Sequence, residues 1–161
     1  MTNLRAEALN ADAFAPFGEV IEEPPVDSAA AKSNRRFDDL IGIDAGPNGR
    51  AMLSLLRVQV PATTPHAITM LERHPLGSQA FIPCTPARLL IAVAPGGDQP
   101  DLNGLRVFVT NGRQGMNYRR GVWHAPIAAL APATLMVIDR NGEGANCDIV
   151  PLAEPLMVSL D

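Results

Sequence analysis

The chain has 161 residues, of which 47% are hydrophobic, and its 17 acidic and 13 basic residues give a formal net charge of −4 at pH 7. This length predicts a single domain over residues 1–161 that buries about two-thirds of its unfolded surface. The basic residues form no dense stretch that could neutralise phosphates, which excludes a nucleic-acid partner.

Three further features predict the environment of the protein. The longest apolar runs, such as residues 89–95, fall well short of the roughly 20 residues that span a bilayer, so we expect a soluble protein with no membrane partner. The first 20 residues lack a basic segment followed by a long apolar one, which predicts no secretory signal and a cytoplasmic location. Cys84 and Cys147 are too few for a disulfide framework and are expected to be buried free thiols.

The spacing of proline and glycine predicts a mostly β protein, because 15 prolines and 13 glycines divide the chain into segments too short for many helices. One short helix is expected at residues 11–15, where Asn10 can act as the N-cap and Pro16 ends the segment. We expect strands at residues 19–22, 52–60, 66–74, 78–83, 88–95, 105–110, 122–130, 134–139 and 156–160, the last at a sheet edge. Nine or ten short strands at this spacing predict a sandwich or barrel.

Two segments between these elements stand out. Residues 23–32 contain two prolines and three alanines with neither the helix nor the strand period, which predicts an irregular loop that could cover a pocket. Residues 34–37 then place two arginines beside an aromatic ring, just before the acidic pair Asp38 and Asp39.

The stretch from residue 66 to residue 83 carries the densest set of chemically active side chains. At the strand period, Glu72 and His74 share one face. Residues 75–77 supply a turn, and the strand that follows would pair with the first as a hairpin. We therefore expect Glu72, His74 and Gln79 to lie close together, and residues 112–126 to line the same pocket from a second hairpin.

Two histidines in these segments are candidates for metal ligands or for acid–base catalysis, since imidazole titrates near neutrality. The spacing Glu72-x-His74-x4-Gln79, followed by Gly121-x-x-His124, resembles the two-part cupin signature H-x-H-x4-E and G-x-x-H. A metal site formed by His74, His124 and Glu72 is therefore predicted. Gln79 stands where the signature has a carboxylate, and a neutral amide is a weaker metal ligand.

Three longer segments resemble the ureidoglycolate lyase family, formerly called ureidoglycolate hydrolases, of allantoin and purine catabolism: LERHPLGSQAFIP at residues 71–83, VTNGRQGMNYRRGVWHAP at 109–126 and IDRNGEGANCD at 138–148. The resemblance covers residues 14–148. It implies an all-β, cupin-like jelly-roll β-barrel (a double-stranded β-helix) with a short N-terminal helix, a homodimer, and nickel or another divalent metal as cofactor. The chain departs from the family at Ala125, where the family usually has W-H-H-P, and around Ser33 and Asn34, where it has I-N-x-G.

The implied reaction agrees with the residues present. Ureidoglycolate is a carbinolamine that carries a carboxylate, and its cleavage to glyoxylate and urea needs a base for the hydroxyl proton, a proton for the departing nitrogen and a cation for the carboxylate. His74 or His124 is the candidate base. A metal held by His74, His124 and Glu72 is the alternative, because it would polarise the substrate hydroxyl or carboxylate.

Substrate contacts are expected from two groups of side chains. Guanidinium groups bind carboxylates bidentately, and the candidates are Arg36, Arg57, Arg73 and Arg119. Neutral donors suited to the urea group are Gln79, Asn117 and Tyr118. By contrast, we expect structural roles for His66, at the start of its strand, and for Asp139 and Arg140, as a pair at a strand end.

Three functional hypotheses remain after this reading. The first is a ureidoglycolate lyase, a carbon–nitrogen lyase acting on (S)-ureidoglycolate. The second is a non-catalytic cupin-like domain that binds a small carboxylate, which Ala125 and the degraded early segment favour. The third is an amidohydrolase or another metal-dependent lyase or isomerase on the same scaffold, because a fold does not fix its chemistry.

Overall fold

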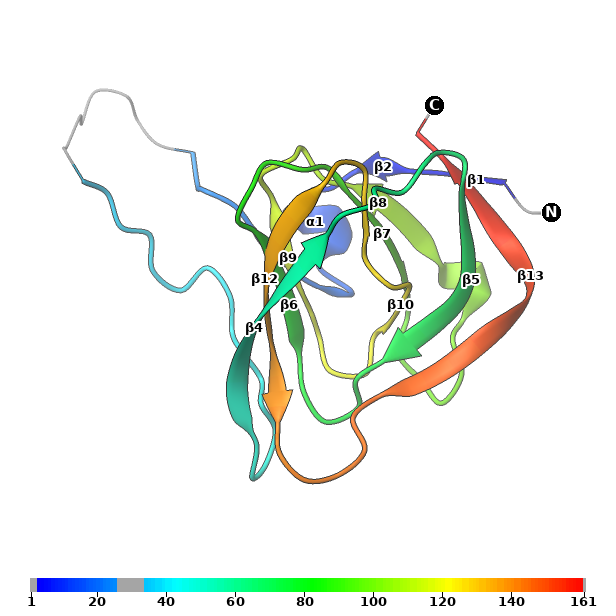
Figure 1. Ribbon diagram of the computed structural model, residues 1–161. Coiled ribbons are helices and arrows are strands. Elements are labelled where there is room, and N and C mark those ends of the chain that lie inside the picture. Colours follow the sequence, from blue (N-terminus) through cyan, green and yellow to red (C-terminus); the bar gives the residue numbers. More distant parts are fainter. Residues whose placement is uncertain (1–2, 26–33, 161) are drawn as a thin grey trace.

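The computed structural model describes residues 3–25 and 34–160, which form two β-sheets and one short α-helix (Figure 1). The larger sheet has eight strands in the order β1-β13-β5-β10-β7-β8-β2, with β11 paired to β7. The smaller sheet has five strands in the order β3-β9-β6-β12-β4. Neither helix in the described residues has the length and apolar run that a membrane crossing requires.

The strand bounds follow the predicted segments in the middle of the chain. The larger sheet contains β1 (Asn3–Arg5), β2 (Glu7–Ala8), β5 (His66–Arg73), β7 (Leu89–Ala94), β8 (Arg106–Val109), β10 (Trp123–His124), β11 (Ala128–Ala129) and β13 (Asp148–Ser159). The smaller sheet contains β3 (Gly18–Ile21), β4 (Arg50–Val58), β6 (Gln79–Pro83), β9 (Gly115–Tyr118) and β12 (Ala133–Asn141). The helices are α1 (Ala11–Phe14) and a 3-10 turn, η1 (Leu102–Gly104).

The larger sheet curls until it nearly closes on itself. Strand β1 pairs in parallel with β13 at one end of the sheet, and β2 pairs in parallel with β8 at the other. Only Ala6 separates β1 from β2, and it is buried. The predicted all-β barrel with a short N-terminal helix is therefore confirmed, and the Asn10 Oδ1 atom accepts the Ala13 N–H at 2.9 Å as the predicted N-cap.

Two apolar cores result from this curl, one on each face of β7. All six residues of β7 are buried, as its continuous apolar run predicts. Leu89, Ile91 and Val93 belong to the first core, between the two sheets. The alternate residues Leu90, Ala92 and Ala94 belong to the second core, inside the curl of the larger sheet.

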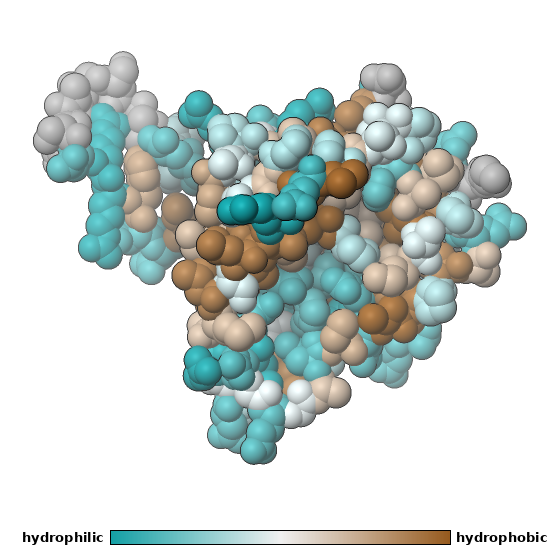
Figure 2. All heavy atoms as spheres, in the orientation of Figure 1, coloured by the Kyte–Doolittle hydropathy of each residue, from teal (hydrophilic) through white to brown (hydrophobic). Residues whose placement is uncertain are grey.

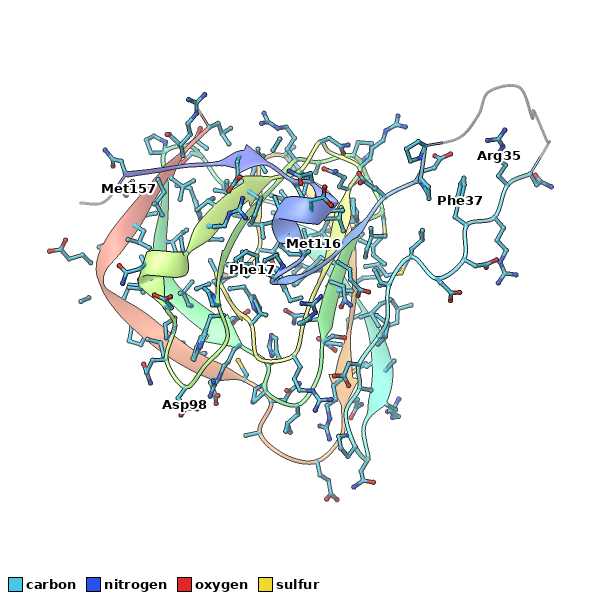
Figure 3. The ribbon with its side chains drawn as sticks, turned by 180° about the vertical axis from the view of Figure 1, so that it is seen from behind. Phe17, Arg35, Phe37, Asp98, Met116 and Met157 are labelled. Carbon is cyan, nitrogen blue, oxygen red and sulfur yellow. The ribbon has the colours of Figure 1, made fainter. Side chains whose placement is uncertain are left out.

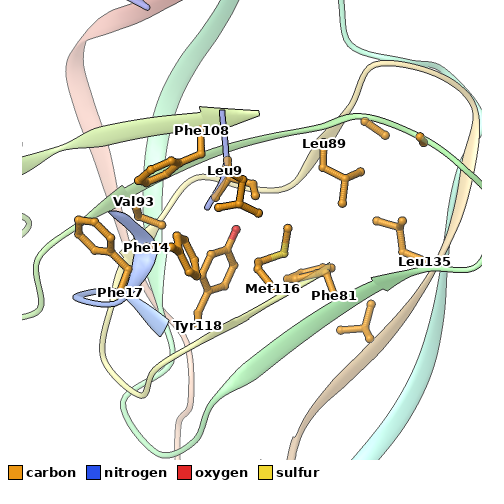
Figure 4. Packing of buried hydrophobic residues seen from close by; sticks show 14 of the residues in the cluster. Leu9, Phe14, Phe17, Phe81, Leu89, Val93, Phe108, Met116, Tyr118 and Leu135 are labelled. Carbon is orange, nitrogen blue, oxygen red and sulfur yellow. The ribbon is translucent and has the colours of Figure 1, made fainter. Parts of the chain in front are cut away.

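Aromatic rings fill much of the first core (Figure 4). Phe14 of α1 packs edge-on against Phe108 of β8, with ring centroids 5.6 Å apart at 83°. Figure 3 shows Phe17 and Met116 in the body of the molecule, whereas Arg35 and Phe37 lie on a segment that extends away from it. The helix is thus anchored to the larger sheet by its buried ring, although it has only one turn.

The predicted hairpin over residues 66–83 is wrong. Strand β5 belongs to the larger sheet and β6 to the smaller one, so the intervening turn carries the chain from one sheet to the other. The backbone groups of this turn bond to distant loops: the His74 carbonyl accepts the Gly121 N–H, and the Ser78 N–H donates to the Asp44 carbonyl. The second hairpin, expected over residues 112–126, is wrong for the same reason, because β9 and β10 also lie in different sheets.

Four smaller predictions also need correction or lie outside the described residues. Strand β13 is not an edge strand, because β1 pairs with its other side. The single strand predicted at 122–130 is two short strands, β10 and β11, on either side of Pro126. Cys84 and Cys147 are exposed rather than buried. Most of the loop predicted at 23–32 lies in residues 26–33, which the structure does not describe.

Truncating the first core should be costly. Leu135 is fully buried there, and Leu135→Ala should lower the free energy of unfolding by about 2 to 5 kcal/mol, because a cavity replaces the lost side chain. Leu102→Ala is the matched control, since Leu102 is exposed and its loss should change stability by no more than about 0.5 kcal/mol. Urea denaturation measures both, and equal effects would show that Leu135 does not support the core.

Candidate active site

Three of the predicted side chains converge at one end of the first core. Glu72 of β5 lies directly opposite His124 of β10, and His74 follows β5. One potential ligand atom from each residue lies within 4.8 Å of the others. Because His124 also lies opposite Val93, which belongs to the first core, this group (hereafter the triad) faces the space between the two sheets.

Backbone carbonyls hold both imidazoles in one orientation. The His74 Nδ1 atom lies 2.6 Å from the Asn146 carbonyl oxygen, and the His124 Nδ1 atom lies 3.0 Å from the Val122 carbonyl oxygen. A carbonyl oxygen can only accept, so Nδ1 carries a proton in each ring, and in the neutral ring Nε2 has the lone pair. Both Nε2 atoms are buried and have no hydrogen-bond partner among the described residues.

The carboxylate of the triad is ionised at neutral pH. The neighbouring His124 imidazole lowers the pKa of the Glu72 carboxyl, and His74 adds to the effect, while burial acts in the opposite direction. The Glu72 Oε1 atom lies 3.6 Å from the His124 Nε2 atom, which is beyond the usual hydrogen-bond range, so this contact is electrostatic. The His124 side chain is 2% exposed and that of Glu72 is 21% exposed, so screening by water is limited.

The donor set of the triad fits a divalent transition metal. Two imidazole nitrogens and one carboxylate oxygen are ligands that zinc, nickel, iron and manganese accept. A ligand histidine usually donates its second ring N–H to a carbonyl or carboxylate, and both triad histidines do so. The unpartnered Nε2 atoms are therefore the atoms that a metal would need.

Tyr118 and Gln79 extend the site onto the smaller sheet. The Tyr118 ring stacks on the His124 ring with centroids 4.2 Å apart at 19°. Gln79 lies opposite Tyr118 in the pairing of β6 with β9, and its Oε1 atom is buried with no partner among the described residues. Burial, together with the Glu72 charge, raises the pKa of the Tyr118 hydroxyl, which Figure 4 shows among the side chains of the apolar core. Tyr118 therefore contributes its ring face to the site.

Two of the predicted substrate ligands lie on the opposite faces of their strands. Arg73 follows Glu72 directly, so its side chain points to the other side of β5, where it pairs with Asp148 at 2.8 Å. Its guanidinium lies 4.8 Å above the Trp123 ring and also donates to the Gly97 carbonyl. Arg57 is exposed on β4, away from the first core. The structure does not bring either arginine to the triad.

Other candidates are also placed elsewhere. The Asn117 amide donates to Glu19 at 2.8 Å and to the Gly42 carbonyl at 3.0 Å, on the outer side of the smaller sheet. Arg36 forms an exposed pair with Asp38 at 2.6 Å, and Arg119 is exposed. None of the four arginines proposed as carboxylate ligands therefore contacts the triad among the described residues.

His66, for which a structural role is predicted, lies apart from the other two histidines. It begins β5, is half-buried, and lines a separate cavity of about 210 Å³ with Ala125 and Pro126. Burial lowers the pKa of its imidazole. His66 consequently offers a matched control for substitutions of the triad.

The structure places two further residues, Asp139 and Asn146, differently from what the sequence predicts or outside what it predicts. Asp139 does not pair with Arg140, whose guanidinium instead donates to the carbonyls of Ala45 and Glu143. The Asp139 Oδ1 atom is buried with no partner among the described residues, and strand alternation with Val137 of the first core could have identified its inward direction. Asn146 was not predictable, because its role comes from its backbone carbonyl and from a side-chain bond to the Leu76 N–H.

Comparison with known proteins gives a consistent result. The family model described as ureidoglycolate lyase matches residues 1–159. A ureidoglycolate lyase of Pseudomonas syringae pv. syringae is 46% identical over 165 residues, covering 100% of this chain and 96% of its own length, and one of Burkholderia mallei (strain NCTC 10229) has the same identity and coverage. A ureidoglycolate lyase of Azotobacter vinelandii is 49% identical over 152 residues, covering 92% of this chain and 91% of its own length.

The triad should bind one divalent ion per chain. We expect Ni²⁺ or Zn²⁺ to bind the metal-free protein. His74→Ala or His124→Ala should weaken metal binding by at least about 100-fold, because each variant removes one of the three ligand atoms. His66→Ala should leave the affinity unchanged. Isothermal titration calorimetry measures this, and an unaltered affinity in His124→Ala would contradict the assignment.

Proposed function

The chain belongs to the ureidoglycolate lyase family, and from this membership we propose that it cleaves (S)-ureidoglycolate to glyoxylate and urea as a carbon–nitrogen lyase. The observation that carries the proposal is the convergence of His74, His124 and Glu72 with both Nε2 atoms free. The proposed unit of activity is the whole chain as one barrel domain. The cytoplasmic location stays a prediction.

The charge of the substrate supports a metal at the triad. Ureidoglycolate is an anion, the triad contributes an ionised carboxylate, and none of the four candidate arginines contacts the triad among the described residues. These arginines therefore do not supply the cation that the substrate carboxylate needs there. We propose that His74, His124 and Glu72 hold a divalent ion, with nickel as one candidate. When bound, such an ion would neutralise the carboxylate and polarise the hydroxyl of the substrate.

The residues of the chain supply orientation and exclude water. The carbonyls of Asn146 and Val122 fix the direction of the two Nε2 atoms, and the Tyr118 ring restrains the plane of His124. The reaction needs no net proton, because the hydroxyl proton of the substrate ends on the nitrogen of the departing urea. In a metal-free reaction, a free imidazole Nε2 atom would carry that proton.

The departure at Ala125 does not weaken this proposal. Ala125 belongs to the second core, and its backbone N–H donates to the Ala92 carbonyl, so it lies on the opposite side of β7 from the triad. The second departure from the family, around Ser33 and Asn34, includes Ser33, which lies outside the described residues. Of the two observations that favoured the hypothesis of a non-catalytic binding domain, Ala125 therefore no longer does so.

Purified protein supplied with (S)-ureidoglycolate should release glyoxylate and urea in equal amounts with no stoichiometric ammonia. His124→Ala should reduce kcat by about 10² to 10⁴, the usual value of positioned acid–base or metal chemistry, and His66→Ala should leave it unchanged. Activity lost on chelation and restored by metal would support a metal at the triad, and activity kept after chelation would support an imidazole base. Ammonia release would indicate an amidohydrolase, and binding of glyoxylate without turnover would indicate a binding domain.

We also propose a homodimer that uses the outer face of β4, the last strand of the smaller sheet. Leu53 and Leu55 on this face are 62% and 71% exposed, and Val60 follows them in the chain, also exposed. Figure 2 shows hydrophobic residues gathered on the side of the molecule that carries β4. A contiguous exposed apolar patch of this kind is typical of a surface that another copy covers.

Light scattering should give twice the mass of the chain for the unaltered protein. Leu55→Asp should shift the mass to that of a monomer, because it would bury a charge in the interface. Leu102→Asp is the control, since Leu102 is also exposed but lies on η1. A dimer that survives Leu55→Asp would exclude this face as the interface.

A further inference from the structure

A second pair of unpartnered polar atoms faces the same space as the triad, but from the smaller sheet. The Gln79 Oε1 atom and the Asp139 Oδ1 atom are both buried, and neither has a hydrogen-bond partner among the described residues. Both atoms are acceptors, and burying an acceptor without a donor is unfavourable. N–H or O–H groups of a ligand could therefore donate hydrogen bonds to these two acceptor atoms.

The register of the smaller sheet sets these residues side by side. Strand β12 pairs with β6 so that Val137 lies opposite Phe81 and Ile138 opposite Ala80, and the next step of this antiparallel register places Asp139 beside Gln79. Gln79 in turn lies opposite Tyr118. The resulting row of Asp139, Gln79 and Tyr118 (hereafter the acceptor row) crosses three neighbouring strands.

The acceptor row is continuous with the triad. Its last member, Tyr118, stacks on His124 at 4.2 Å, and neighbouring strands lie about 4.8 Å apart, so Gln79 and Asp139 lie about one and two strand spacings further on. The neighbouring inward-facing residues on the same strands, Phe81 and Val137, belong to the first core. The row thus forms the polar boundary between the apolar core and the site.

The chemistry of the row selects one end of the substrate. A carboxylate repels the anionic end of ureidoglycolate, but it accepts two parallel N–H groups well, and the ureido group offers N–H donors on both nitrogens. The Gln79 amide adds an acceptor oxygen and donors suited to the ureido carbonyl. With the proposed divalent ion held at the triad to offset the Glu72 charge, an anionic substrate would therefore bind with its carboxylate toward the triad and its ureido group toward the row.

We propose that Asp139 and Gln79 form the subsite that binds the ureido group, and that they determine which leaving group the enzyme accepts. This inference rests on the proposed function, which supplies the substrate. It assigns a binding role to Asp139, for which the sequence suggested only a structural pair with Arg140. It also accounts for why two buried acceptors lack partners in the described part of the chain.

Two ligands separate this subsite from the triad. N-carbamoylglycine keeps the carboxylate and the ureido group but lacks the reacting hydroxyl, whereas glyoxylate lacks the ureido group. Asp139→Asn should weaken binding of N-carbamoylglycine by about 10- to 100-fold, because an N–H₂ donor replaces one of its two acceptor oxygens, and should change glyoxylate affinity less than twofold. Gln79→Met, which keeps the side-chain size, should show the same selective loss.

Glu143→Gln is the matched control, since it removes a carboxylate from an exposed loop residue near Asp139 in the chain and should change neither affinity. Calorimetric titration of each ligand measures the effects without turnover. Equal losses for the two ligands, or no loss for N-carbamoylglycine in both variants, would overturn the subsite. A different outcome would separate the two proposals. If Asp139→Asn selectively loses N-carbamoylglycine but the unaltered protein releases no glyoxylate and urea, the proposed reaction is overturned and the ureido-binding subsite is supported.

Discussion

The structure of the site depends on the pairing of β10 with β5, which sets His124 directly opposite Glu72. This pairing joins residues 52 positions apart in the chain and brings an ionised carboxylate to within 3.6 Å of a buried imidazole. On the other face of the same two strands, the Arg73 guanidinium lies over the Trp123 ring, and the Gly97 carbonyl accepts from both side chains. These contacts on the second-core face thus hold together the strands whose first-core face carries the chemistry.

Loops between the strands fix the position of the His74 ring. Asn146, between β12 and β13, fixes the His74 ring through its carbonyl and the turn after His74 through its side chain. The loop before β4 supports the same turn, where the Asp44 N–H donates to the Ser78 hydroxyl at 2.9 Å and the Asp44 carboxylate pairs with Arg120. The Arg120 guanidinium lowers the pKa of the Asp44 carboxyl, so this support is charged at neutral pH. Three segments far apart in sequence therefore determine the position of one imidazole.

Local patterns in the sequence predicted local features of the structure, and failed where distant segments had to be matched. The apolar run of β7 and the Asn10 cap depend on neighbouring residues, and each was predictable. The convergence of Glu72, His74 and His124 joins distant segments and was predicted only through the resemblance to the two-part cupin signature. The partners of β5 and β6 were not predictable, because a period of two specifies a strand but not the sheet it joins. Strict alternation would have excluded Arg73 and included Asp139, so those two errors came from weighing residue type above strand phase.

The crossing of the chain between the two sheets directly after His74 has a mechanical consequence. The triad belongs mainly to one sheet and the acceptor row to the other, and only the four residues 75–78 separate His74 of the triad from Gln79 of the row. The width of the sandwich therefore sets the distance between the two halves of the site. The aromatic and aliphatic side chains that fill the first core keep the two sheets a fixed distance apart. Their volume therefore determines how long a ligand must be to contact both sheets at once.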